Sequence, residues 1–230
     1  MTEEKQVNQT ALLIKNALIL FAITLVAGVL LGIVYELTKG EISRQEAQAI
    51  VEANQAVFSG IDNFNKIYDA KEAIDPARDE QIAAAWSELQ SSDAAFAKVK
   101  LQSVSEALDV SGNLAGYVIN VASSGYSSDV TFSIGMTMEG HLNGISIISI
   151  AESPGLGMEA EPVLVPQFVN ATAEGVAQGR DDMPFSLIKN TDPGIGQIRA
   201  ITAATITSNA ITNGVNAGVA FFNNTLKGAL

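Results

Sequence analysis

The chain contains no cysteine and only one histidine, His141, among its 230 residues. Iron–sulfur clusters held by cysteine thiolates and zinc sites built from cysteine and histidine are therefore excluded. Catalysis by a Ser-His-Asp or Cys-His arrangement would have to use His141, which lies in a predicted hairpin turn. We interpret His141 as a solvent-exposed turn residue.

Basic residues are scarce: 13 Lys and Arg stand against 25 Asp and Glu, a formal net charge of -12. No basic patch is available to neutralise phosphates, so nucleic acid is not an expected partner. Docking on an anionic lipid surface is disfavoured for the same reason. The length allows a membrane anchor and one further domain with its own core.

An uncharged, almost wholly apolar run of 19 residues extends from Ala17 to Tyr35. As a helix it spans about 28 Å, close to the hydrocarbon thickness of a bilayer. A cleaved signal peptide is the alternative, but the run exceeds a usual signal core and no small-residue cleavage site follows. The pattern predicts an N-terminal tail over 1–16 and a transmembrane helix over 17–38. Positive charges balance across it, so charge alone does not decide its orientation.

Beyond the membrane segment the pattern changes to that of an amphipathic helix. Residues 40–59 carry apolar side chains at helical spacing, and Gly60 ends them. Residues 61–112 are mixed and acidic, with a helical segment over 80–89. We expect 39–110 to form a connecting helix and the start of a soluble domain, whose helices pack on a sheet.

From residue 114 onward apolar and polar residues alternate with a period of two. Residues 130–138 predict a half-buried strand with one apolar face. A glycine-containing turn over 139–144 separates it from a second strand over 145–150, which predicts an antiparallel hairpin.

Two helices are expected after the hairpin, a short one around 163–169 and a long one over 203–225. Gly214 and Gly218 would let the long helix pack closely on a sheet. The predicted class is α+β: one N-terminal transmembrane helix, then a soluble antiparallel-sheet domain with packed helices over 111–225.

The most distinctive stretch is Ile201–Ser208, where threonine hydroxyls gather at the expected start of the last helix. The first turn of a helix offers free N–H groups and the positive end of the dipole, which suit a phosphate. The alternative is that these hydroxyls only cap the helix. Glycine-bearing loops at 123–126 and 152–157 match neither the Walker nor the Rossmann fingerprint.

Four separated motifs agree in order and spacing: Gly125-Tyr126, Glu152-Ser-Pro-Gly-Leu-Gly157, Gln167-Phe168 and Ile201–Ser208. Together they resemble the covalent FMN-binding domain family over roughly 110–222. That family includes the G subunit of the Rnf ferredoxin:NAD oxidoreductase complex and the C subunit of the sodium-translocating NADH:quinone reductase. The N-terminal stretch over 15–39 is similar to the Rnf member.

In that family a threonine of a Ser/Thr-Gly-Ala-Thr motif carries FMN through a phosphoester, which a separate flavin transferase forms with FAD as donor. Residues 202–205 occupy the motif, so the resemblance implies Thr205 as the acceptor. Ala203 stands where the motif has glycine. Arg199 stands where an aspartate is common, and we expect it to add a cation near the phosphate.

The resemblance further implies an FMN site, without a metal or a catalytic residue of its own. Its predicted members are Thr205 as the covalent attachment point, with Thr202, Ala204, Ile206, Thr207, Gly125, Tyr126, Glu152, Ser153, Pro154, Gly155, Leu156, Gly157 and Gln167. Within the site we expect the 152–157 loop to lie against the flavin ring. Tyr126 would either stack on the ring or be buried as core.

As a whole, the resemblance implies an electron-carrier subunit that works with other subunits of an Rnf-type membrane complex coupling ferredoxin:NAD electron transfer to ion translocation. The N-terminus would be cytoplasmic and the soluble domain extracytoplasmic. Two alternatives stay open. One is the C subunit of the sodium-translocating quinone reductase; the other is a non-redox, membrane-anchored binding module.

Overall fold

The structure is a computed structural model that describes residues 3–168, 185–189, 191–194 and 196–229. The chain divides into two compact units, residues 1–48 and residues 49–230. Residue 169, the last residue of the short helix predicted over 163–169, lies outside the described residues.

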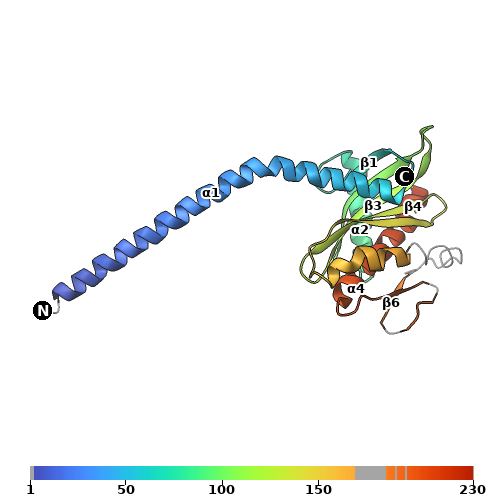
Figure 1. Ribbon diagram of the computed structural model, residues 1–230. Helices are drawn as coiled ribbons and strands as arrows, with labels where there is room; N and C mark the ends of the chain where they lie inside the picture. The colour runs from blue at the N-terminus through green and yellow to red at the C-terminus, as the bar shows by residue number, and fades with distance from the viewer. Residues whose placement is uncertain (1–2, 169–184, 190, 195, 230) are drawn as a thin grey trace. The chain divides into compact units, whose positions relative to one another are not determined.

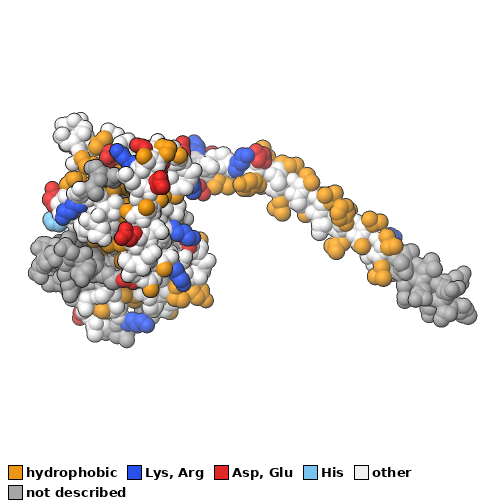
Figure 2. Space-filling view, turned by 180° about the vertical axis from the view of Figure 1, so that it is seen from behind, with side chains coloured by type: hydrophobic (Ala, Val, Ile, Leu, Met, Phe, Trp, Pro, Cys, Tyr) orange, Lys and Arg blue, Asp and Glu red, His pale blue; other side chains and the backbone are white. Residues whose placement is uncertain are grey.

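Helix α1 runs from Glu3 to Val57. Its residues up to 48 belong to the first unit, and its last residues belong to the second. Among the helices in the described part of the chain, only α1 is long and apolar enough to cross a membrane, in its segment from Leu12 onward. Large apolar side chains stay exposed along it from Leu12 to Leu37, and Figure 2 shows them distributed over the helix. The helix therefore has the length and surface of a membrane anchor.

The second unit is built on a five-stranded antiparallel sheet in which each strand pairs with the next along the chain. Its strands are β1 Asn63–Asp69, β2 Val99–Leu108, β3 Leu114–Ser124, β4 Asp129–Thr137 and β5 Leu142–Ser149. The predicted hairpin is confirmed as β4 and β5, with Ile134 opposite Ile145. His141 lies exposed in the turn between these strands, as expected.

One face of the sheet carries helices α2 (Pro76–Ser92) and α4 (Thr205–Phe221), as Figure 1 shows. The prediction for Gly214 and Gly218 is confirmed. A Cβ on Gly214 would lie 2.5 Å from the Phe132 Cζ, and one on Gly218 would lie 2.4 Å from the Ile134 Cδ1. Phe132 and Ile134 are fully buried and cannot move aside easily. Only glycine at positions 214 and 218 therefore lets α4 lie this close to β4.

The opposite face is also covered, which corrects the expectation of a half-buried β4. The last turn of α1 packs there through Val57, in a second apolar cluster with Phe58, Ala107 and Val118. Residues from the two elements also hydrogen-bond, since the Ser133 Oγ donates to the Asn54 Oδ1 at 3.0 Å. The period-two pattern shows one apolar face, but it cannot show that a distant helix covers the other.

Strands β1 and β2 lie in residues where the sequence pattern indicates only helical and mixed structure. Both carry register shifts, between Lys66 and Tyr68 in β1 and between Leu101 and Ser103 in β2. A bulge reverses which residues face the core, so a strict alternation is lost over the strand. The helical segment expected over 80–89 is confirmed as part of α2.

The remaining elements bring three separate segments together. After β5 the chain forms helical turns, η1 (Gly157–Glu159) and η2 (Ala160–Leu164). A short parallel pair, β6 (Ser186–Ile188) with β7 (Gln197–Arg199), leads to α4, which ends in η4 (Phe222–Leu226) and α5 (Lys227–Ala229). The β3–β4 turn, the segment after β5 and the start of α4 thus meet at one pocket.

Candidate functional site

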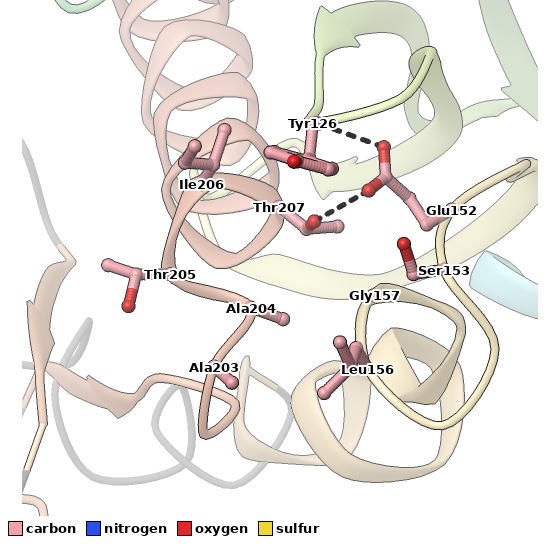
Figure 3. A pocket seen from close by; sticks show the side chains of 10 residues that line it. All are labelled: Tyr126, Glu152, Ser153, Leu156, Gly157, Ala203, Ala204, Thr205, Ile206 and Thr207. Carbon is pink, nitrogen blue, oxygen red and sulfur yellow. Dashed lines mark hydrogen bonds between the residues drawn. The ribbon is translucent and has the colours of Figure 1, made fainter.

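A pocket of about 420 Å³ lies where these three segments meet. Figure 3 shows its lining: Tyr126, Glu152, Ser153, Leu156, Gly157, Ala203, Ala204, Thr205, Ile206 and Thr207. This volume falls in the range of roughly 300–1,000 Å³ that is usual for small-molecule and cofactor sites.

Helix α4 begins at Thr205 without a side-chain cap. Its N-cap residue is Ala204, and the first intrahelical hydrogen bond runs from the Ser208 N–H to the Ala204 carbonyl at 3.0 Å. The N–H groups of Thr205, Ile206 and Thr207 have no acceptor among the residues that the structure describes. The start of α4 therefore offers the free donors and the positive dipole end that bind a phosphate.

The turn that leads into α4 is held by Ser208. Its Oγ accepts a hydrogen bond from the Ile201 N–H at 3.0 Å and donates one to the Ala204 carbonyl at 2.9 Å. Within this turn Ala203 has φ = 61°, and it is the one non-glycine residue with positive φ in the described chain. A side chain in this left-handed conformation costs roughly 1–2 kcal/mol.

We expect Ala203→Gly to stabilise the domain by about 0.5–1 kcal/mol. Glycine removes the left-handed strain, and part of that gain is offset because glycine loses more backbone entropy on folding. The matched control is Ala84→Gly, at an exposed position inside α2, which should instead destabilise by about 1 kcal/mol. Chemical denaturation of the three proteins measures both signs; a destabilised Ala203→Gly would contradict the strain at this turn.

The three threonines of the cluster occupy different environments. Thr202 is exposed and lies outside the pocket lining, whereas Thr207 is 1 % exposed and donates its hydroxyl to the Glu152 Oε2 at 2.9 Å. Thr205 is half-buried, lines the pocket and has no hydrogen-bond partner among the described residues. Figure 3 shows Thr205 and Thr207 on opposite sides of the first turn of α4.

Glu152 lines the pocket and is 7 % exposed. Its Oε1 accepts hydrogen bonds from three successive backbone N–H groups, those of Tyr126 at 2.9 Å, Ser127 at 3.1 Å and Ser128 at 3.4 Å. Its Oε2 accepts the Thr207 hydroxyl (Figure 3). One carboxylate therefore joins the β3–β4 turn to the first turn of α4.

Two glycines make room for this carboxylate. A Cβ on Gly125 would lie 2.3 Å from the Glu152 Oε1, and one on Gly157 would lie 2.6 Å from the Glu152 Cβ. Gly155 differs from both, because open space surrounds it and its φ of 71° is the reason for glycine there. The glycines of the 152–157 loop thus serve distinct physical needs.

Three large apolar side chains in the pocket lining are exposed. Tyr126 is 70 % exposed, Ile206 53 % and Leu156 38 %. Of the two predictions for Tyr126, burial in the core is wrong: its side chain is exposed and lines the pocket, because Tyr126 belongs to the β3–β4 turn and not to a strand. Stacking on a flavin stays a prediction.

The structure brings nine of the fourteen predicted site residues to the pocket. They are Tyr126, Glu152, Ser153, Leu156, Gly157, Ala204, Thr205, Ile206 and Thr207. The five that do not line it are Gly125, Pro154, Gly155, Thr202 and Gln167. Their contribution to flavin binding stays a prediction, as does that of the nine.

Gln167 and Arg199 bind one another and lie outside the pocket lining. The backbone N–H of Arg199 donates to the Gln167 Oε1 at 2.7 Å, and the Gln167 Nε2 donates to the backbone carbonyl of Arg199 at 3.1 Å. The guanidinium of Arg199 pairs instead with Asp192 at 2.5 Å. In this arrangement the cation expected beside the phosphate is engaged elsewhere.

Sequence reasoning did not identify the role of Glu152 as the residue that joins two segments. Its carboxylate contacts residues 24 to 26 positions earlier and 55 positions later in the chain, and no local pattern encodes such pairs. The available signal was an acidic residue that opens a glycine-rich loop in an otherwise apolar neighbourhood.

Two family profiles match this chain. The sequence profile of the FMN-binding domain matches residues 125–220, and that of the RnfG N-terminal region matches residues 9–57. The chain thus contains an FMN-binding domain, and the profile covers the β3–β4 turn, Glu152 and α4 together.

Curated relatives then define the family. The chain is 30% identical to the G subunit of the Na(+)-translocating ferredoxin:NAD(+) oxidoreductase complex of Acetobacterium woodii, over 98% of this chain and 99% of the relative. It is 25% identical to the G subunit of the proton-translocating ferredoxin:NAD(+) oxidoreductase complex of Clostridium ljungdahlii, over 95% of each. The chain belongs to the family formed by the G subunits of ion-translocating oxidoreductase complexes.

Solved structures show a weaker likeness. The C subunit of the Na(+)-translocating NADH-quinone reductase from Parabacteroides distasonis is 18% identical with a TM-score of 0.42, over 72% of this chain and 79% of that one. NqrC from Shewanella oneidensis is 19% identical with a TM-score of 0.40, over 53% and 59%. These scores add nothing to the strand order described above.

Proposed function

We propose that this chain is an electron-carrier subunit of an ion-translocating ferredoxin:NAD oxidoreductase complex and that it carries FMN covalently on Thr205. The single observation that supports the attachment is the environment of Thr205 at the start of α4. Thr205 is half-buried, has no hydrogen-bond partner among the described residues, and lines the pocket beside three backbone N–H groups that have no acceptor among those residues.

The choice among the three threonines rests on their environments. The Thr207 hydroxyl is buried and already bound to Glu152, so modification would break that hydrogen bond in a closed site. Thr202 lies outside the pocket. Of the three, only Thr205 both lines the pocket and has a hydroxyl without a partner among the described residues, and a phosphate on its Oγ would lie at the positive end of α4.

The attachment chemistry is a phosphoryl transfer, and we assign it to a separate flavin transferase with FAD as the donor. The bond between the Thr205 Oγ and the FMN phosphorus forms, the pyrophosphate bond of FAD breaks, and AMP leaves while the hydroxyl proton is lost. No new electron source is needed, because the flavin keeps its redox state.

The pocket walls suit a flavin once the phosphate is fixed. When bound, FMN supplies the electron-transfer chemistry. Leu156, Ile206 and Tyr126 provide the apolar surface that would contact the ring and exclude water. Ala203 and Ala204 leave space at the turn, because their side chains are no larger than a methyl group.

The alternatives are less well supported. The RnfG N-terminal profile over residues 9–57 favours a G subunit over the C subunit of the quinone reductase. A binding module in which the threonines only cap the helix does not match α4, because Ala204 is its N-cap and no side chain caps it.

The test is co-expression of the full chain with and without a flavin transferase. We expect a fluorescent band after denaturing electrophoresis, and an intact mass that exceeds the unmodified chain by one FMN less one water, only when the transferase is present. An unmodified mass with an active transferase, verified on a known substrate protein, would contradict the proposal.

We also propose that the N-terminus is cytoplasmic and the second unit extracytoplasmic. The sequence has no cysteine, and Val110 is 100 % exposed in the β2–β3 turn, so Val110→Cys gives a single accessible thiol. An impermeant thiol reagent should label it from the extracytoplasmic side in intact cells. The control Gln9→Cys, in the N-terminal tail, should label only after lysis. The reverse pattern would overturn the proposed orientation.

A further inference from the structure

Glu152 is a charged side chain that is buried in the pocket wall. Both of its oxygens accept hydrogen bonds, from three backbone N–H groups and from the Thr207 hydroxyl, and hydrogen bonds to a carboxylate are charge-assisted. Among the described residues no Lys, Arg or His forms an ion pair with it. Neutral dipoles hold the charge in place but do not cancel it.

The position of this charge matters because Glu152 lines the pocket. A nearly buried charge is screened far less by salt than one on the surface, and its field is stronger in a medium of low dielectric constant. Adding electrons to a ligand in the same pocket places like charges near each other. The ligand's reduced, negatively charged form is therefore disfavoured.

We propose that Glu152 is a positioning residue that binds the β3–β4 turn to the start of α4 and holds one fixed negative charge in the pocket wall, which lowers the reduction potential of the flavin bound there. The effect on potential rests on the proposed function. The positioning does not, since it follows from contacts within the protein itself.

Glu152→Gln separates charge from shape. The glutamine Oε1 can accept the N–H groups of the β3–β4 turn, and its Nε2 can donate to the Thr207 Oγ. The substitution therefore keeps the connection between the two segments and removes only the charge. We expect the flavinylated full chain to fold and its midpoint potential to shift to a more positive value.

Glu159→Gln is the matched control for charge, because Glu159 follows the same loop and is exposed. Its effect on the potential should be smaller and should vanish at high salt, whereas the Glu152→Gln shift should persist. Redox titration against a reference dye, at low and at high salt, measures both variants. An unchanged potential in a folded, flavinylated Glu152→Gln protein would overturn the charge effect.

Glu152→Ala tests the positioning and is measured on the chain made without transferase, which carries no flavin. It leaves three N–H groups and the Thr207 hydroxyl without an acceptor, so its melting temperature should fall clearly below that of Glu152→Gln. Thr207→Val removes one of the four hydrogen bonds and should give an intermediate loss. Equal melting temperatures for Glu152→Ala and wild type would overturn the positioning role.

The two proposals fail in different ways. A wild-type chain without covalent flavin contradicts the proposed function and, with it, the effect on potential, while the melting comparison still decides the positioning. Normal flavinylation with no difference among the Glu152 variants contradicts this inference and leaves the proposed function standing.

Discussion

The Thr205→Ala chain should carry no covalent flavin when it is made together with a flavin transferase. Of the threonine hydroxyls, the substitution removes the one that both lines the pocket and has no partner among the described residues, while the backbone of the first turn of α4 stays in place. Alanine is a good helix former, so α4 itself should not be weakened. Intact mass should fall to that of the unmodified chain, and in-gel fluorescence should disappear.

Three further variants show whether the loss is specific to this hydroxyl. Thr205→Ser keeps a hydroxyl at the same atom position and should retain the added mass. Thr202→Ala should retain it because Thr202 lies outside the pocket, and Thr207→Val because its hydroxyl is bound to Glu152. Flavin that persists in Thr205→Ala, or that maps by peptide mass to Thr207, would contradict the assignment.

Gly157→Ala should destabilise the second unit by about 3 kcal/mol. The added methyl group would lie 2.6 Å from the Glu152 Cβ and 2.9 Å from both the Glu152 Oε2 and the Thr207 Oγ1, where these side chains already fill the space. Overpacking of this kind costs about 1–3 kcal/mol, and displacing the carboxylate weakens its hydrogen bonds as well. Urea denaturation of the flavin-free chain measures the loss.

Gly155→Ala is the control within the same loop. Nothing lies within 4 Å of its Cβ position, so only the left-handed φ of 71° opposes a side chain. The cost of about 1–2 kcal/mol is partly offset by the lower entropy of the unfolded chain, which leaves about 0.5–1 kcal/mol. If Gly157→Ala proves no worse than Gly155→Ala, the close packing around Glu152 is wrong.

Local sequence patterns are enough to predict several parts of this protein. The uncharged run over 17–35 indicates a membrane-spanning helix because its length matches a bilayer. The β4–β5 hairpin and the glycine face of α4 follow from period and spacing. The order of the four motifs led to the family, since together they are more specific than any one of them.

Other features of the fold and of the site depend on contacts between residues far apart in the chain, and these appear only in the folded structure. Register shifts interrupt the alternating pattern of β1 and β2, so the pattern did not predict these strands. The second face of the sheet is covered by the end of α1, which is distant in sequence. The distinction between Thr205 and Thr207 depends on Glu152, 55 positions before Thr207. The sequence shows three similar threonine hydroxyls. Only the packed site shows that Thr207 is bound to Glu152, whereas Thr205 lines the pocket without a partner among the described residues.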